Sequence, residues 1–168
     1  MTPQELQALD RATFNSTLGG IFEHSSWVAQ RAFDAGPFAS VDALHAAMLR
    51  VVHAAPRGEQ LALLRAHPEL AGKAAVRGEL TADSTQEQSG AGLDRCSPEE
   101  FAQITALNVR YNVTFGFPFI VAVKGLDRAA ILREFARRAD SPVAIEFAEA
   151  LQQVARITRF RLDALITR

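Results

Sequence analysis

The chain has 168 residues, a formal net charge of -1 and 48% hydrophobic residues, which suits one domain with a sizeable core. The charge balance excludes a basic field for nucleic acid or for membranes. No apolar run approaches the roughly 20 residues that a membrane helix needs, and the first residues lack the pattern of a secretory signal. A single cysteine, Cys96, excludes an internal disulfide and suits a reducing compartment. We therefore expect a soluble, cytoplasmic protein without nucleic-acid or membrane partners.

Capping residues and apolar spacing predict an all-α domain over residues 1–168, a bundle of about seven or eight helices. The expected helices, in chain order, span 2–17, 21–33, 40–55, 58–66, 81–92, 97–113, 127–139 and 141 to near the end. Residues 73–80 stay ambiguous. Residues 115–123 hold an aromatic Gly/Pro corner and cannot be regular helix throughout. The β-branched run 120–123 within them is too short to make a sheet.

A histidine and a carboxylate are candidates for acid/base chemistry. Pro68 disfavours helical geometry in the residue before it, so a helix should end near His67 and leave the imidazole at a terminus. There it can point into a cleft, or it can bond a nearby carbonyl as a structural residue. Ser84 and Glu87 are three residues apart on one predicted helix and share a face, with Gln88 beside them. A solvated first turn, favoured by the helix dipole, is the structural alternative.

Arg161 is the clearest candidate from periodicity alone. At about 100° per residue, the last helix gathers one apolar stripe, whose members are Val143, Phe147, Leu151, Val154, Thr158, Leu162 and Leu165. Arg161 lies inside this stripe, whereas Arg156 and Arg159 fall outside it. An arginine on an apolar face must either extend to solvent or meet an anion, and near a helix C-terminus the dipole also favours a cation.

Irregular backbone between aromatic residues is the third candidate. Around Phe119 and Ile120 it can leave N–H groups available to a ligand carbonyl while the rings exclude water, although aromatic packing at a kink is the structural alternative. Asn108 and Tyr111 share one face of the preceding helix and are expected to brace this corner.

Other chemistries find little support in the sequence. No His-x-x-x-His pair and no Cys/His cluster predicts a metal site. There is no glycine-rich phosphate loop, and Cys96 lacks the surroundings of a catalytic thiol. His45 lies in the apolar stripe of helix 40–55 and is expected to be a satisfied core histidine. An enzyme with this sequence is expected to work without metal or nucleotide.

Five motifs, in order and at their spacing, resemble one family, the 2-oxo-4-hydroxy-4-carboxy-5-ureidoimidazoline (OHCU) decarboxylases of urate breakdown. They are HPELAG at 67–72, SxxEQ at 84–88, AGL at 91–93, LNxxY at 107–111 and FGFPF at 115–119. The resemblance extends from Phe14 and the segment 18–27 to residues 159–162. One departure is Ser26, where the family usually has proline before the tryptophan.

The resemblance implies a carboxy-lyase that converts OHCU to (S)-allantoin and CO2 without a cofactor. By position, it makes His67 and Glu87 catalytic. The residues it implies for substrate binding are Pro68, Ser84, Gln88, Phe119, Ile120 and Arg161. It also implies that two copies can form a homodimer.

Two other functions stay open on the residues alone. One is a cofactor-independent hydrolase or isomerase of a related ureide or hydantoin, which would release no CO2. The other is a non-catalytic helical interaction module, in which His67, Glu87 and Arg161 are capping and surface residues. Replacing all three would then leave fold and partner binding intact.

Overall fold

The computed structural model describes residues 1–167, and these form ten α-helices and no strand. The prediction of an all-α fold is confirmed. The count exceeds the expected seven or eight because residues 2–17 form two helices and because a short helix, Lys73–Val76, forms in the stretch that stayed ambiguous. The chain divides into two compact units: unit 1 holds residues 1–66 and the chain from residue 155 onward, and unit 2 holds residues 67–154. The single domain over 1–168 stays a prediction.

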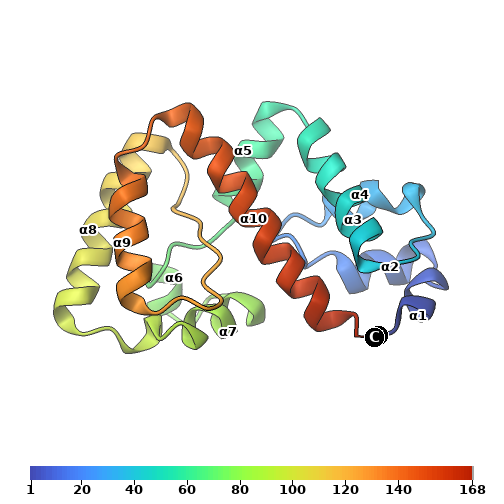
Figure 1. The fold of residues 1–168 in the computed structure, drawn as a ribbon, viewed down its shortest axis with the longest axis horizontal. Coiled ribbons are helices and arrows are strands. Elements are labelled where there is room, and N and C mark those ends of the chain that lie inside the picture. Colours follow the sequence, from blue (N-terminus) through green and yellow to red (C-terminus); the bar gives the residue numbers. More distant parts are fainter. Residues whose placement is uncertain (168) are drawn as a thin grey trace. The chain divides into compact units, whose positions relative to one another are not determined.

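Unit 1 contains five helices and the end of a sixth (Figure 1). They are α1 (Pro3–Gln7), α2 (Arg11–Leu18), α3 (Trp27–Ala32), α4 (Val41–Ala54), α5 (Arg57–Arg65) and the last part of α10 (Val143–Leu165), with a 3-10 turn at Phe33–Ala35. Helix α3 packs against α2 and α4. The core is aromatic around Phe14, whose ring lies 5.2 Å from that of Phe33 and 6.0 Å from that of Phe38.

Two predicted helices of unit 1 were wrong in extent. The single helix expected over 2–17 is broken at residues 8–10, because the Asp10 carboxylate caps a new helix by accepting from the Thr13 N–H. The helix expected over 21–33 begins only at Trp27. Residues 20–26 are turns, and His24 there has a φ of 46°, a left-handed conformation that ends regular helix.

His45 is a satisfied, half-buried histidine, as predicted. Its Nε2 lies 3.1 Å from Thr158 Oγ1, within unit 1. Burial lowers the pKa of His45 from its ordinary value and outweighs the opposing influence of a hydrogen bond to the Ala155 backbone and of the Asp163 and Asp42 carboxylates. The folded chain therefore binds this proton less readily than the unfolded chain does.

Because the unfolded chain binds the His45 proton at the higher pH, the free energy of unfolding should fall as pH drops below about 6.5. A His45→Gln variant, which keeps a polar partner for Thr158 but cannot titrate, should lose less stability across this window. Urea unfolding of both proteins at about pH 7.5 and about pH 5.5 measures the difference. Equal losses in the two proteins would contradict the assignment.

Unit 2 contains four helices and the first part of α10 (Figure 1). They are α6 (Lys73–Val76), α7 (Ala82–Gly90), α8 (Pro98–Phe115), α9 (Arg128–Ala139) and the start of α10, with a 3-10 turn at Leu93–Arg95. Helices α8 and α9 pack side by side. Helix α8 ends at Phe115, and its C-cap Gly116 has a φ of 74°, which suits a residue without a side chain. The chain then runs without regular structure through residues 117–123, as predicted.

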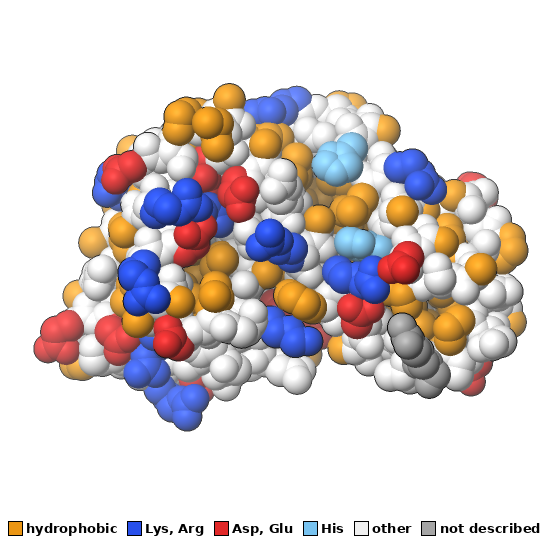
Figure 2. Space-filling view, viewed as in Figure 1, with side chains coloured by type: hydrophobic (Ala, Val, Ile, Leu, Met, Phe, Trp, Pro, Cys, Tyr) orange, Lys and Arg blue, Asp and Glu red, His pale blue; other side chains and the backbone are white. Residues whose placement is uncertain are grey.

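The surface agrees with the near-neutral charge. On the face drawn in Figure 2, basic and acidic side chains are interspersed. None of the helices within residues 1–167 is both long and apolar enough to span a membrane.

Candidate active site

His67 lies in a loop between two helices of the chain. Helix α5 ends at Arg65 with Ala66 as its C-cap, so the break expected before Pro68 is confirmed. The His67 side chain belongs to unit 2 and is buried, with 7% of its surface exposed. Pro68 beside it is half-buried. A buried imidazole at the end of a helix is held in one place, which general acid/base chemistry requires.

Amide side chains hold the rest of this loop in place. Gln88 Oε1 accepts from the Ala71 N–H at 3.0 Å, and Gln88 Nε2 donates to the Glu69 carbonyl at 3.2 Å. Asn108 Nδ2 donates to the Leu70 carbonyl at 3.0 Å. These bonds support a left-handed backbone at Ala71, whose φ is 47°. Three successive loop residues after Pro68 are therefore fixed by side chains from α7 and α8.

Helix α7 presents one face to the protein interior. Thr81 caps it by accepting from the Ser84 N–H at 3.3 Å, as predicted. Ser84 and Gln88 are buried, and Glu87 is half-buried. The solvated first turn, the structural alternative, is therefore wrong for Ser84. Gln88 was expected to bind substrate. In the structure its amide forms hydrogen bonds with the backbone of the loop that follows His67.

The segment 117–123 is packed on aromatic rings. Phe119 stacks on Phe135, with ring centroids 4.0 Å apart and planes 9° from parallel. The Tyr111 ring meets Phe115, Phe117 and Phe119 at centroid distances of 4.4–5.9 Å. Tyr111 therefore braces the aromatic corner, as predicted, whereas the Asn108 amide bonds Leu70 in the other loop.

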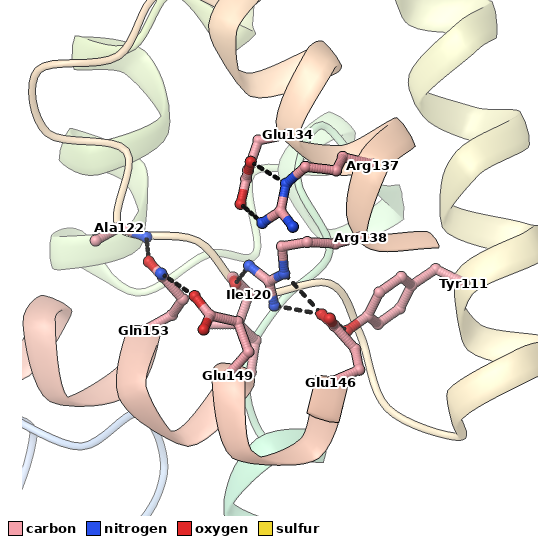
Figure 3. A network of polar contacts seen from close by, with 9 residues as sticks. All are labelled: Tyr111, Ile120, Ala122, Glu134, Arg137, Arg138, Glu146, Glu149 and Gln153. Atoms are coloured by element: carbon pink, nitrogen blue, oxygen red, sulfur yellow. Dashed lines mark hydrogen bonds and ion pairs between the residues drawn. The ribbon is translucent and has the colours of Figure 1, made fainter. Parts of the chain in front are cut away.

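A buried ion pair lies beside this segment (Figure 3). Arg138 on α9 and Glu146 on α10 are 0% and 1% exposed, and Arg138 Nη2 lies 2.5 Å from Glu146 Oε1. The Tyr111 hydroxyl donates to the same Glu146 oxygen at 2.5 Å. Burial, followed by the Glu146 carboxylate, raises the pKa of Tyr111 well above its usual range. Tyr111 therefore stays a neutral donor.

Arg161 meets an anion inside unit 1. Its Nη1 lies 2.8 Å from Glu23 Oε2, and both side chains are buried. This satisfies the expectation for an arginine on an apolar face, with a carboxylate of the chain itself as the anion. Arg159 is bound at the surface to Asp42 and Asp163.

The predicted stripe of α10 was wrong at one end. Val143 is 52% exposed, and the next two residues, Ala144 and Ile145, are exposed as well. Val154 and Leu162 are buried, as predicted.

Sequence reasoning missed Arg138, Glu146 and the bracing of the His67 loop by Asn108. Arg138 stands in the run Arg137–Arg138 near a helix end, where charge usually indicates a solvated surface. The available signal was spacing, since Arg138 shares the inward face of α9 with Ile131 and Phe135.

Neither a metal nor an activated thiol is supported. Among residues 1–167, no three His, Cys, Asp or Glu side chains are grouped to hold a metal ion. The Cys96 thiol donates to the Leu93 carbonyl at 3.3 Å. Burial raises the pKa of Cys96, which disfavours the nucleophilic thiolate.

An Asn108→Leu variant tests the bracing of the His67 loop. Leucine keeps the volume but leaves the buried Leu70 carbonyl without its donor, which should cost about 1–3 kcal/mol of stability. A looser loop should also lower kcat/KM, by about tenfold. Chemical unfolding and steady-state kinetics measure the two effects. The control is Gln103→Leu on the exposed face of the same helix. Equal stability and rate in both variants would show that the bond is unimportant.

The comparisons with known proteins agree over almost the whole chain. Residues 7–163 match the family model described as OHCU decarboxylase. The chain is 43% identical over 162 residues to the 2-oxo-4-hydroxy-4-carboxy-5-ureidoimidazoline decarboxylase of Haloferax volcanii, covering 96% of this chain and 94% of that protein. It is 42% identical over 166 residues to the uric acid degradation bifunctional protein PucL of Bacillus subtilis, covering 99% of this chain and only 33% of PucL.

One solved structure extends the comparison to the fold. The crystal structure of (S)-allantoin synthase matches with a TM-score of 0.80 at 29% identity, covering 99% of this chain and 54% of that one. The helical fold and these matches define a class of all-α decarboxylases. Within it, the chain belongs to the OHCU decarboxylase family.

Proposed function

We propose that this chain decarboxylates OHCU to (S)-allantoin and CO2 in urate breakdown, without a cofactor. The observation that carries the proposal is similarity over nearly full length, at 43% identity, to a named OHCU decarboxylase. The name of the matched structure, (S)-allantoin synthase, supports the handedness of the product.

The substrate explains why no cofactor is required. Decarboxylation leaves an electron pair on the carbon that carried the carboxylate. In OHCU that carbon lies beside a C=N bond, which accepts the pair, so the substrate supplies the electron sink that pyridoxal or thiamine provides elsewhere. The protein must hold the carboxylate out of the ring plane, reduce its solvation and protonate one face of the enol-like intermediate.

The candidate residues of unit 2 suit these tasks. His67 is the acid/base, handling the substrate hydroxyl proton or delivering the proton that sets chirality. Glu87 holds the ureido or ring N–H groups, and Ser84 contacts the substrate. In support, His67 and Ser84 are buried and the loop after His67 is fixed by side-chain bonds.

Backbone groups of the aromatic segment are the remaining substrate-binding groups that we propose in unit 2. The N–H groups of Phe119 and Ile120 donate to no residue within the described chain, which supports their binding of the ring carbonyl. Pro68 and Gln88 border the site. Gln88 acts there by holding the Glu69–Ala71 backbone.

Arg161 is proposed to orient polar groups of the substrate. Its guanidinium is bound to Glu23, so it is already ordered and partly neutralised. An arginine with five donors can bond a carboxylate of the chain and a ligand together.

Circular dichroism of the product tests the proposed reaction. The protein is added to OHCU freshly made from urate, with CO2 release followed in parallel. Fast appearance of the (S)-allantoin signal together with CO2 is the expected result. Slow decay of OHCU without a circular dichroism signal, with CO2 released no faster than in the absence of the protein, would contradict the proposal.

Related hydantoins and ureides would then be assayed, because turnover of one of them without CO2 would favour the hydrolase or isomerase alternative. The proposal also includes a homodimer and a cytoplasmic location. Light scattering of the purified protein tests the first, and fractionation of native cells tests the second.

A further inference from the structure

One buried side chain contacts both aromatic-segment residues of the candidate site. Arg138 Nη1 donates to the Ile120 carbonyl at 2.6 Å, and its Cζ lies 4.6 Å from the centroid of the Phe119 ring. Its Nε donates to Glu146 Oε1 at 2.7 Å (Figure 3). The planar guanidinium of Arg138, a residue of α9, therefore links the irregular segment to α9. Through its counter-ion Glu146 it also links the segment to α10.

Stability alone does not account for an ion pair at this position. Arg138 and Glu146 are both removed from water, and apolar residues of similar volume often replace such a pair without loss of stability. A guanidinium does what apolar side chains cannot do, because it sets the direction of a carbonyl through a hydrogen bond of fixed geometry. The direction of the Ile120 carbonyl is thus set from within the core.

A second anchor acts two residues further along. Gln153 Oε1 accepts from the Ala122 N–H at 2.9 Å, and Gln153 Nε2 donates to Glu149 Oε1 at 2.8 Å (Figure 3). The backbone is thus held at the Ile120 carbonyl and at the Ala122 N–H. Between α8 and α9, these two bonds supply the constraint that a helix or sheet would otherwise provide.

We propose that Arg138, with Glu146 as its counter-ion, is a positioning residue for the decarboxylation. It does not touch substrate. It fixes the Phe119–Ile120 backbone so that the N–H groups of that segment are aligned before substrate arrives. This inference rests on the proposed function for its effect on rate, but the constraint on the backbone is independent of the reaction.

The central test is the double variant Arg138→Met/Glu146→Leu, which removes both charges and keeps an apolar core of similar volume. We expect cooperative unfolding to be retained and kcat/KM for OHCU to fall about 10²-fold, since small misplacement of a binding group is costly. Hydrogen exchange, read by mass spectrometry on peptides covering 117–123, should become faster. The matched control is Arg137→Met, one residue away on α9, whose guanidinium pairs with Glu134 and is 63% exposed.

A folded double variant with wild-type kcat/KM and wild-type exchange would overturn the proposal. If the double variant does not fold, Arg138→Lys replaces it. An ammonium can neutralise Glu146 but does not reproduce the planar fork, so both rate loss and faster exchange in 117–123 are expected. Wild-type values for both measurements in this variant would likewise overturn the proposal.

The two proposals fail in different ways. A wild-type protein that releases no CO2 from OHCU refutes the proposed function, whatever the variants do. Unchanged exchange over 117–123 in the variants, with an active wild-type protein, refutes the positioning role and leaves the proposed function in place.

Discussion

Replacement of His67 by asparagine should lower kcat/KM for OHCU by about 10²–10⁴-fold, the usual contribution of a positioned acid/base group. Asparagine can occupy the same buried position and form hydrogen bonds, but it cannot take up or deliver a proton near neutral pH. The fold should survive, because the loop after His67 is held by Gln88 and Asn108. Steady-state kinetics and far-ultraviolet circular dichroism check both expectations.

The matched control is His53→Asn, an exposed histidine near the end of α4. It should keep full turnover. The handedness of the remaining product separates the two proton steps assigned to His67. Racemic allantoin from a slow variant would indicate that His67 delivers the stereochemical proton, whereas slow formation of pure (S)-allantoin would indicate a role at the substrate hydroxyl. Full turnover by His67→Asn would exclude His67 from the chemistry.

A Glu87→Gln change is expected to lower kcat/KM by about 10²–10⁴-fold as well. Glutamine preserves size and one acceptor oxygen, but it lacks the negative charge that holds two N–H groups of a ureido or ring system. Because Glu87 is half-buried on α7, we expect the loss to be in catalysis and substrate binding, with the fold intact. Initial rates over a range of OHCU concentrations separate kcat from KM.

Glu79→Gln, an exposed carboxylate shortly before α7, is the control for this experiment. It removes a charge of the same kind from the surface and should leave both kinetic constants unchanged. A loss under about tenfold in Glu87→Gln would assign Glu87 a structural role. Rates that fall equally in the two variants would point to a general effect of net charge on an anionic substrate.

Local features of the helices were predictable because their causes lie within a few residues. Ser40, Thr81, Ser97 and Asp127 each accept a hydrogen bond from the backbone N–H three residues ahead, as the capping rule requires. The breaks before Pro68 and after Phe115 also follow from single residues, a proline and a left-handed glycine. The break at Asp10 was missed because the helical spacing of apolar residues continues from α1 into α2. Within such a pattern, a capping aspartate cannot be told from a polar residue on the solvent-facing side of one continuous helix.

In the candidate site, too, local motifs could be found in the sequence and contacts between distant residues could not. The motifs around His67, Glu87 and Ile120 were readable in the sequence, and their roles stay predictions. Arg161 was singled out from its stripe, but its partner Glu23 was not, since 138 residues separate them.

By itself, the sequence determined the helical class, most helix ends, the family and the candidate residues. Only the tertiary structure decided which polar side chains are internal supports. In the sequence, Arg138 and Glu146 look like ordinary surface positions, and Asn108 looks like a brace of the aromatic corner. In the folded unit 2, Arg138 bonds Glu146 and the Ile120 carbonyl, and Asn108 bonds the Leu70 carbonyl. The role of a buried polar group depends on the partner with which it forms a hydrogen bond, and tertiary packing determines which partner lies within reach.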